Sequence, residues 1–349
     1  MPPTAPPLPP PPATEAELED VLSTPTPGVL DTLRRVPGDV VVLGAAGKMG
    51  PTLARMVRRA IDALGRRDRV IAVSRFSSAG AEHQFRAAGV ETARCDLIDR
   101  AAVAALPDAP NVIFMAGQKF GTSDAPATTW AMNTVVPAIA AERYARSRIV
   151  AFSTGNVYPL TPATSAGARE DDALGPVGEY ANSCVGRERV FEYYSARHGT
   201  PVAIVRLNYA IDLRYGVLTD VATKVYRGEP VDVRMGHVNV IWQGDANAQA
   251  IRCLEHAASP PFVINVTGRE TLSIRAIAQR FGELLGCAPH IMGEEAPDAL
   301  LSNAERAESL FGPPTVSVDQ MLMWVADWIR RGGALLGKPT HFESRDGTF

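Results

Sequence analysis

A glycine-rich turn carries the residues of this chain best suited to bind a charged ligand. It follows the apolar run 40–43 and opens directly into the helical pattern 51–60. Glycines there let the main chain approach a pyrophosphate, and the helix N-terminus supplies amide donors and a partial positive charge. The candidate contact residues are Gly44, Gly47, Lys48, Met49 and Gly50. This pattern predicts a dinucleotide site, with a tight strand-to-helix turn that binds no ligand as the alternative.

The elements that would position this turn alternate regularly between apolar strands and helices. Strands are expected at 40–44, 70–74, 90–93, 111–116, 148–153 and 202–207. Helices are expected between them at 49–64, 79–88, 99–105, 127–146 and 179–198. Such an alternation is typical of helices packed on both faces of a parallel sheet. We therefore predict an α/β fold with a Rossmann-type doubly wound parallel sheet and right-handed crossovers.

Beyond residue 207 the pattern becomes irregular, which indicates a smaller C-terminal substrate lobe. Helices are expected there at 216–227, 244–257, 273–286 and 318–331, and strands at 231–235 and 262–266. Near the other end, Thr14 and Glu17 have the spacing of a capping box that starts a short helix. The predicted organisation is a disordered Pro-rich arm at 1–13, a helical extension at 14–36, an NAD(P)-binding Rossmann domain at 37–210, and an interleaved substrate lobe with its tail at 211–349.

Composition excludes several classes of protein. The chain has 349 residues, of which 46% are hydrophobic, so it can bury a large core. A formal net charge of -3 gives no general attraction for nucleic acid or an anionic membrane, and no apolar run is long enough to cross a bilayer. The four cysteines are scattered without metal-ligand spacing and are expected to be reduced. We predict a cytoplasmic protein that binds a small molecule, with no metal, nucleic acid or membrane partner.

Further motifs follow the glycine turn in a fixed order. They are an Asp-Leu pair after the third strand, an Ala-Gly pair after the fourth, an asparagine in the next helix, and a Ser-Thr pair that ends the fifth. The residues are Asp96, Leu97, Ala116, Gly117, Asn133, Ser153 and Thr154. Together with the GxxGxxG spacing of the turn, they resemble the extended short-chain dehydrogenase/reductase family, also called the NAD-dependent epimerase/dehydratase family. The similarity runs from about residue 39 to residue 330.

This resemblance implies an activity and its cofactor. It implies hydride transfer between NAD or NADP and a carbohydrate-like or other polyhydroxylated substrate, by an oxidoreductase or epimerase. Thr154 and Tyr180 would then hydrogen-bond the reacting oxygen. Contacts to the cofactor are implied for Asp96, Leu97, Ala116, Gly117, Asn133 and Tyr180. A homodimer is implied through the helices at 127–146 and 179–198.

Cofactor preference depends on the end of the second strand. A carboxylate there would accept hydrogen bonds from the ribose 2'-hydroxyl of NAD, whereas a cation would receive the 2'-phosphate of NADP. This chain has Ser74 and Arg75 at that position and no carboxylate. Arg75, with Lys48 in the glycine turn, can form charge-assisted hydrogen bonds to phosphate. The residues therefore favour NADP over NAD.

The motif around Tyr180 departs from the family pattern. The family's tyrosine is followed four residues later by a lysine, which on a helix lies on the same face and lowers the pKa of the tyrosine. Cys184 occupies that position here. A free tyrosine has a pKa of about 10, so without a nearby cation Tyr180 supplies little phenolate at neutral pH.

Three accounts of this departure remain open. Lys119, just after the fourth strand, replaces the missing cation and leaves an active oxidoreductase. Alternatively, Thr154 and Tyr180 only orient a substrate hydroxyl and the chemistry is slower or different. In the third account the protein binds a dinucleotide without catalysis, as a sensor or scaffold. A reactive Cys184 is disfavoured, because nothing beside it in the sequence would clearly lower its pKa.

The substrate motifs also depart from those of nucleotide-sugar enzymes. These enzymes have an Arg-Leu-x-Asn segment and a later arginine that hold the diphosphate, whereas this chain has Arg206-Leu-Asn208 and no arginine at 238–245. Losing a bidentate arginine weakens the case for UDP- or dTDP-sugars. An unactivated sugar, a sugar acid or another polyhydroxylated molecule is the alternative. The residues expected to contact substrate are Asn156, Asn208 and Tyr209.

Overall fold

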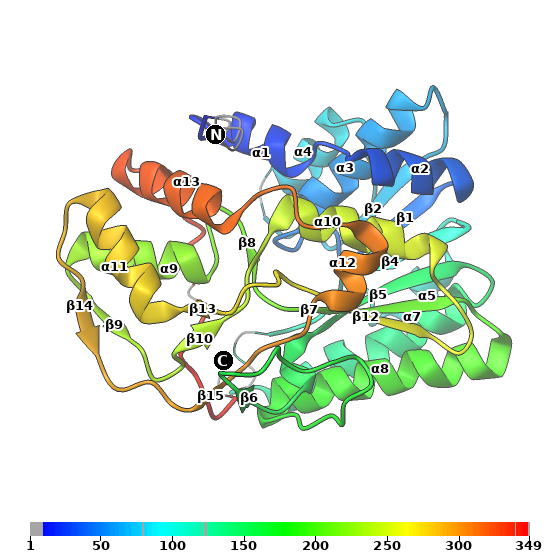
Figure 1. The fold of residues 1–349 in the computed structure, drawn as a ribbon. Helices are drawn as coiled ribbons and strands as arrows, with labels where there is room; N and C mark the ends of the chain where they lie inside the picture. Colours follow the sequence, from blue (N-terminus) through cyan, green and yellow to red (C-terminus); the bar gives the residue numbers. More distant parts are fainter. Residues whose placement is uncertain (1–9, 79, 120, 122–123, 339, 348–349) are drawn as a thin grey trace.

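The computed structural model describes residues 10–78, 80–119, 121, 124–338 and 340–347 and has two joined parts (Figure 1). One is a parallel sheet covered by helices on both faces. The other is a smaller lobe built around the helices α9 (Val217–Arg227), α11 (Ile274–Leu285) and α13 (Val318–Arg330). The predicted Rossmann-type α/β fold with a smaller C-terminal lobe is confirmed.

In the described part of the chain, seven strands form the main sheet, and every neighbouring pair is parallel. Their spatial order is β12 (Phe262–Val266), β7 (Val202–Leu207), β5 (Arg148–Thr154), β4 (Asn111–Phe114), β1 (Val40–Leu43), β2 (Val70–Ser74) and β3 (Glu91–Arg94). The chain order reverses between β1 and β4. Ligands of open parallel sheets bind outside the carboxyl ends of the strands at such a switch point.

The register of the strands brings their carboxyl ends to one edge. Leu43 of β1 pairs with Val73 of β2 and with Phe114 of β4. Thr154, the last residue of β5, pairs with Leu207 of β7. The segments that follow these strands therefore gather at one edge of the sheet, which is where the predicted site residues belong.

Burial on both faces explains the unbroken apolar runs. Val40 and Val42 join the core beneath α3 (Gly50–Ala63), whereas Val41 and Leu43 join the core on the opposite face. Successive side chains of a strand point to opposite faces, so both sets must be apolar when helices cover the sheet on both sides.

Helices cover the two faces unequally. The face with α3 also carries α2 (Pro27–Arg35) and α10 (Gln243–Arg252), while α4 (Ala81–Ala87) packs near α3 at its edge. The other face carries α5 (Arg100–Ala104), α7 (Val136–Arg143) and α8 (Gly178–His198). The helical stretch expected at 127–146 is present at 126–143, where α6 (Pro126–Trp130) joins α7 through a π-helical turn at Ala131–Val135. The homodimer expected through these helices stays a prediction; Trp130, Val135 and Tyr193 on them are exposed.

Two segments that the sequence pattern placed in the C-terminal lobe belong to the main sheet and its helices. The strand expected at 262–266 is β12, which extends the main sheet beside β7, and Ile264 and Val266 join the core under α3. The helix expected at 244–257 includes α10, which packs on α2 and α3. A five-residue apolar strand gives no sequence signal for which sheet it joins. The 211–349 range therefore contributes to both parts of the molecule.

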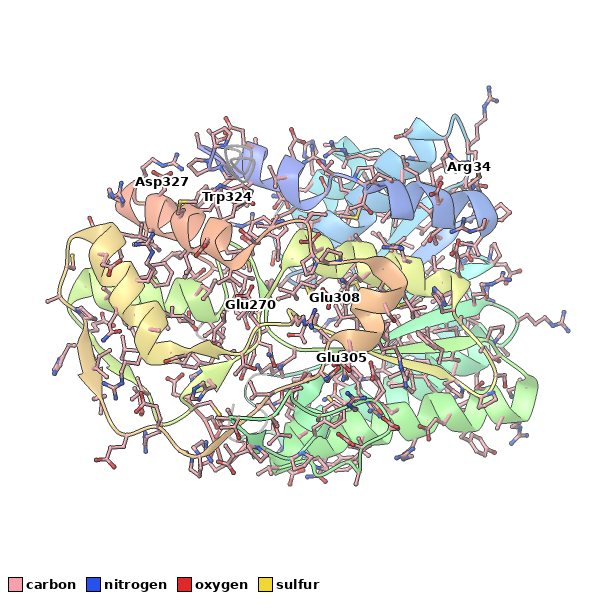
Figure 2. All side chains as sticks on the ribbon, viewed as in Figure 1. Arg34, Glu270, Glu305, Glu308, Trp324 and Asp327 are labelled. Carbon is pink, nitrogen blue, oxygen red and sulfur yellow. The ribbon has the colours of Figure 1, made fainter. Side chains whose placement is uncertain are left out.

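The lobe has its own apolar core, to which the N-terminal helix α1 (Glu15–Leu22) contributes Leu18 and Leu22. Trp324 of α13, labelled in Figure 2, packs edge-on against Trp242 with ring centroids 5.4 Å apart. Short strands complete this part in the pairs β8 (Ala210–Ile211) with β11 (Ile241–Trp242), β9 (Pro230–Asp232) with β14 (His290–Met292), β10 (His237–Val238) with β13 (Leu272–Ser273), and β6 (Thr161–Pro162) with β15 (Asp298–Ala299). Helix α12 (Glu305–Phe311) packs against β12.

Both ends of the described chain are tied down. Residues 1–9 of the predicted disordered arm lie outside the described residues, but Arg331 donates hydrogen bonds to the carbonyls of Pro12 and Ala13. In the tail, Thr340 donates from its amide (2.8 Å) and its hydroxyl (2.6 Å) to Asp220 of α9. Further along, Gly347 contacts Gly178 at the start of α8. Across the described residues, no helix is both long enough and apolar enough for a bilayer crossing.

Candidate active site

The three glycines of the turn between β1 and α3 are present for different reasons. Gly44 has a φ of +81°, and a Cβ there would lie 2.6 Å from the amide nitrogen of Ala116. A Cβ on Gly50 would collide with the carbonyl of Ala45. Gly47 is exposed, and a Cβ there would meet only the Gly44 oxygen, at 3.4 Å. The fold needs Gly44 and Gly50, whereas Gly47 leaves bare main chain of the kind that a pyrophosphate requires.

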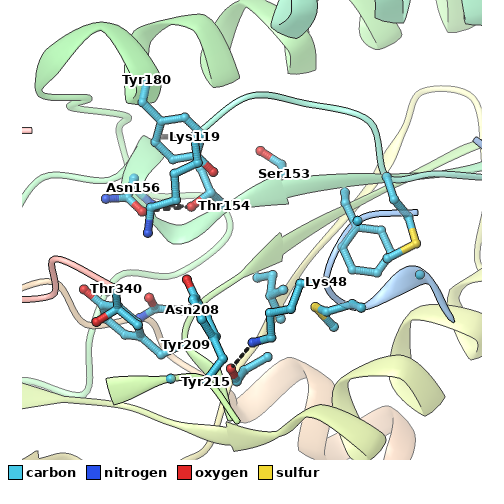
Figure 3. A pocket seen from close by; sticks show the side chains of 18 of the residues that line it. Lys48, Lys119, Ser153, Thr154, Asn156, Tyr180, Asn208, Tyr209, Tyr215 and Thr340 are labelled. Carbon is cyan, nitrogen blue, oxygen red and sulfur yellow. Dashed lines mark hydrogen bonds between the residues drawn. The ribbon is translucent and has the colours of Figure 1, made fainter. Parts of the chain in front are cut away.

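A cavity of about 250 Å³ lies beside this turn, where the sheet meets the lobe. The ends of β5 and β7, the first turn of α8 and the start of α9 complete its walls. Figure 3 shows one wall with Lys119, Thr154, Asn156 and Tyr180, and a facing wall with Lys48, Asn208, Tyr209, Tyr215 and Thr340. The residues expected to contact substrate and those expected to be catalytic thus line one cavity.

A larger hollow of about 1010 Å³ adjoins this cavity. The two share Gly47, Lys48, Lys119 and Tyr215 as lining residues. The hollow continues past the glycine turn to α4 on one side and to α1 on the other. An elongated ligand whose diphosphate lay at Gly47 would have room on both sides of the turn, so the residues present fit a dinucleotide.

Thr154 and Tyr180 form a hydroxyl pair on the first wall. The Thr154 hydroxyl donates to Asn156 Oδ1 (2.9 Å), and its hydrogen bond with Tyr180 favours the phenolate. Burial nevertheless raises the pKa of Tyr180 well above its usual value, and the nearby Cys184 raises it further. The positive charge of Arg187 acts in the opposite direction. Tyr180 is therefore a protonated hydrogen-bond donor at neutral pH and requires help from a cation to act as a base.

Cys184 lies one helical turn after Tyr180 and is fully buried. It packs with Val157 and Tyr158 in a small apolar cluster. Burial raises the pKa of its thiol, so the thiolate is scarce at neutral pH. These surroundings agree with the interpretation of Cys184 as a packing residue.

Arg187 is a buried cation that sequence reasoning missed. It donates to the carbonyl of Phe152 (2.8 Å) and to Asn133 Oδ1 (2.5 Å), and its Nε has no hydrogen-bond partner among the described residues. A Cβ on Gly117 would collide with its guanidinium. The only sequence signal for Arg187 is its position seven residues after Tyr180, which places both side chains on one face of α8.

Asn133 and Gly117 shape the segment after β4 instead of lining the cavity. The Asn133 amide accepts from the main-chain N–H of Gln118 (2.9 Å) and donates to the Gln118 carbonyl (3.0 Å) and to the Ser183 hydroxyl (2.9 Å). Gly117 lines the larger hollow. The hydrogen bonds of Asn133 to Gln118 fix the course of the chain that leads to Lys119.

Lys119 extends across the cavity from the first wall. Its Nζ lies 6.0 Å from the ring centroid of Tyr180. Burial lowers the pKa of Lys119 to about 8, while Asp220 and the Cys184 sulfur act to raise it. The structure thus places an ammonium group beside Tyr180, as the first account of the missing lysine requires.

The Lys48 side chain points to the lobe wall of the cavity and not to the phosphate site expected for it beside Arg75. Its ammonium donates to the carbonyl of Ala210 (3.1 Å) and lies 3.8 Å from the ring centroid of Tyr215, on the lobe wall. Burial lowers its pKa to about 7, with a contribution from the positive charge of Lys119. Arg75 is exposed at the end of β2 and does not line this cavity. Lys48 and Arg75 therefore do not form the joint phosphate site that the sequence indicated.

The remaining cofactor candidates follow the expected strands but lie outside the cavity. Ser74 ends β2, and its carbonyl accepts from the amide of Cys95 (3.0 Å). Asp96 is exposed after β3, whereas Leu97 is buried in the core. Ala116 packs against Gly44. These positions border the same edge of the sheet as the glycine turn, and Met49 of that turn lines the cavity.

Arg206, which the sequence associated with a diphosphate site, is committed to the core. Its guanidinium forms a two-pronged ion pair with Glu188 of α8 (2.8 Å) and donates to the Tyr158 hydroxyl (2.7 Å). Glu188 also accepts from the Ser153 hydroxyl (2.5 Å). Asn208 and Tyr209, by contrast, do line the cavity, and Tyr209 has a φ of +42°.

A model of the NAD dependent epimerase/dehydratase family matches residues 40–242, more than half of the chain. The chain belongs to this family. No curated protein matches it. Among solved structures, it is similar to the UDP-glucose 4-epimerase of Thermotoga maritima with UDP-glucose (17% identity, TM-score 0.69). It is also similar to the Thermus thermophilus UDP-glucose 4-epimerase with NAD (20%, 0.67) and to the Bacillus cereus UDP-glucuronic acid 4-epimerase with NAD (18%, 0.68).

Each of these three structures covers 84% of this chain and 99% of its own chain. At such identities the similarity shows the shared fold. This member of the epimerase/dehydratase family has additional segments, since α1 and α2 precede the matched range. Helix α1 is joined to the lobe by an ion pair between Glu19 and Arg214 (2.7 Å), and both residues border the larger hollow. The capping box predicted this helix but gave no sign that it borders the site.

Proposed function

We propose that this family member is an NAD(P)-dependent oxidoreductase or epimerase that acts on a carbohydrate-like or other polyhydroxylated alcohol. The proposal rests on the observation that a glycine turn and a pair of hydroxyl groups line the same cavity. The open main chain at Gly47 fits a diphosphate, and the hydroxyls of Thr154 and Tyr180 face the same space. Titration with NADH and NADPH, followed by turnover against a panel of sugars and sugar acids, tests it.

In this proposal, different residues of the chain bind the coenzyme and the substrate. Amides of the turn from Gly47 to Gly50 would hold the diphosphate at the start of α3. When bound, the dinucleotide supplies a nicotinamide ring that accepts or donates the hydride. Thr154 and Tyr180 would hydrogen-bond the substrate oxygen, and Tyr180 would exchange the proton of the alcohol.

We propose that Lys119 supplies the positive charge that Tyr180 needs. Cys184 occupies the place at which the family pattern has a lysine, and no other lysine follows Tyr180 on α8. Lys119 lines the cavity beside Tyr180 from a different element, the segment after β4. A cation near a phenol stabilises the phenolate and lowers its pKa. If Lys119 does not act in this way, Thr154 and Tyr180 retain only the orientation of a substrate hydroxyl.

A second candidate function is binding of a dinucleotide without catalysis. The raised pKa of the partly buried Tyr180, which the neighbouring Cys184 raises further, favours it. Tight binding of NADH or NADPH combined with no turnover of any alcohol, and no effect of Tyr180→Phe, would support this sensor or scaffold over the enzyme.

The glycine turn allows a test that separates ligand binding from folding. Gly47→Ala is expected to weaken dinucleotide binding by about 10-fold or more, because the new Cβ points into the space assigned to the diphosphate. Unfolding free energy should change by less than about 1 kcal/mol, since nothing of the protein lies closer than 3.4 Å to that Cβ. Fluorescence titration and urea unfolding provide the two measurements.

Gly50→Ala is the matched comparison for that experiment. Its Cβ would collide with the Ala45 carbonyl, so it should destabilise the fold by about 1–3 kcal/mol. If Gly47→Ala bound the dinucleotide as tightly as the wild type, the diphosphate would have to lie elsewhere.

We propose that the protein prefers NADP over NAD, because Arg75 lies at the end of the second strand. Arg75→Ala is expected to raise the Kd of NADPH about 10-fold and to leave the Kd of NADH unchanged, because a charge-assisted hydrogen bond to phosphate is worth about 1.5–3 kcal/mol. Arg67→Ala removes another exposed arginine and serves as the control. Equal affinity of the wild type for NADH and NADPH would refute the preference.

We do not propose UDP-sugars, after which the similar enzymes are named, as substrates of this chain. Arg206 is held by Glu188 and Tyr158 in the core and is not available to a diphosphate. We propose a smaller, unactivated substrate that contacts Asn156, Asn208 and Tyr209 in the cavity of about 250 Å³.

A further inference from the structure

The cavity beside Tyr180 has an unbalanced set of charges. Two of its lining residues are lysines, Lys48 and Lys119, and no aspartate or glutamate is found among the described residues that line it. The remaining polar lining groups are hydroxyls and amides, from Ser153, Thr154, Asn156, Tyr180, Asn208, Tyr209, Tyr215 and Thr340. Such a cavity is suited to a negatively charged ligand that also carries hydroxyl groups.

Among the described residues, no carboxylate forms an ion pair with Lys48. Its ammonium has three donors, of which one reaches the Ala210 carbonyl, and the Tyr215 ring covers another side. The nearest acidic residues have other partners: Asp212 binds Arg214 (2.7 Å), and Asp220 accepts both hydrogen bonds from Thr340.

This arrangement is unfavourable until an anion binds. Withdrawing an ammonium from water costs free energy, and burial lowers the pKa of Lys48 to about 7, although the negative charges of Asp212 and Asp220 act to raise it. Lys119 adds to this cost, because the two positive charges repel each other across the cavity. A bound carboxylate would offset both effects.

The positions of the two walls then define how a ligand would lie. Thr154, Asn156 and Tyr180 present hydroxyl and amide groups on one wall, and Lys48 with Tyr215 lies on the facing wall (Figure 3). A molecule with an alcohol at one end and an anion at the other would satisfy both walls together. A neutral sugar would leave Lys48 without a counterion.

We propose that the substrate is a hydroxy-carboxylate, such as a sugar acid, whose carboxylate binds Lys48 while its reacting alcohol faces Thr154 and Tyr180. This inference rests on the proposed function and names the substrate class for the same cavity. The other source of negative charge is the diphosphate of the coenzyme, which shares the glycine turn with Lys48. The experiment must therefore measure carboxylate and coenzyme binding separately.

The test uses two matched pairs of probes, D-glucuronate with D-glucose and D-galacturonate with D-galactose. Each is titrated by calorimetry into the full chain saturated with NADPH or NADH, at constant ionic strength. The wild type is expected to bind at least one acid about 10-fold or more tightly than its neutral partner. Lys48→Met should abolish that preference while the coenzyme still binds, and Lys48→Arg should retain part of it. Lys224→Met, at a lysine absent from the described lining of both this cavity and the larger hollow, is the control.

Three results would overturn the inference. The first is equal binding of acid and neutral sugar by the wild type. The second is a Lys48→Met variant that loses coenzyme affinity but keeps the preference for the acid, which would assign Lys48 to the diphosphate. If neither pair binds, glycerate, tartrate and gluconate are compared with their neutral polyols, and absence of any preference for a carboxylate refutes it. Failure of the proposed function is a different result, namely absence of coenzyme binding by the wild type.

Discussion

Tyr180→Phe is expected to lower kcat by about 10²–10⁴-fold, the usual contribution of a positioned general acid or base. Binding of the dinucleotide should change little, because the ring remains in place and only the hydroxyl is lost. Turnover is measured as the change in absorbance of the reduced coenzyme, and binding by fluorescence titration. Tyr193→Phe is the control, since Tyr193 lies on the same helix α8 but is exposed.

Lys119→Met shows whether the effect of Tyr180 depends on the neighbouring cation. If Lys119 stabilises the phenolate, the variant should lose much of the activity, and the double variant Tyr180→Phe/Lys119→Met should be no worse than Tyr180→Phe alone. Additive losses would assign the two side chains independent roles. A fully active Tyr180→Phe enzyme would remove the hydroxyl pair from the mechanism.

The second large effect is expected on stability, at the buried ion pair beneath the cavity. Glu188→Leu should lower the free energy of unfolding by about 3–5 kcal/mol, because it leaves the Arg206 guanidinium buried without its counterion. The Ser153 hydroxyl would lose its acceptor as well. Urea unfolding followed by circular dichroism measures the change.

The double variant Glu188→Leu/Arg206→Leu provides the comparison for that loss. Removing both charges should cost less than the sum of the two single changes, since apolar side chains replace a desolvated pair. Purely additive losses would show that the pair contributes through packing alone. Ser153, Glu188 and Arg206 belong to β5, α8 and β7, so this pair joins the elements that carry Thr154, Tyr180 and Asn208.

Local patterns were sufficient to predict the first strand, the glycine turn and the helix after it. Val40–Leu43 is apolar on both faces because helices cover the sheet on both sides, and Gly50 reflects a close contact with Ala45 within the turn itself. Each of these signals lies within about ten residues of chain. The positions of Thr154 and Tyr180 at one cavity also follow from strands and helices whose order the sequence indicated.

Contacts between distant segments were not predictable in the same way. Residues 262–266 joined the main sheet because β7 offered a free parallel edge, which no pattern within those residues reveals. The direction of the Lys48 side chain depends on Ala210 and Tyr215, more than 160 residues further along the chain. Arg187 became a site residue because Asn133 and Phe152 converge on it. Such placements follow from tertiary packing, which overrides local propensity.

The contacts of the C-terminal segment limit how the lobe can move relative to the sheet. It is hydrogen-bonded to the lobe through Thr340 and Asp220, and its Gly347 contacts Gly178 at the start of α8, two residues before Tyr180. If the lobe rotated away from the sheet, one of these two contacts would have to break first. If ligand exchange requires the lobe to move away from the sheet, we expect the exchange and the release of this segment to share one rate.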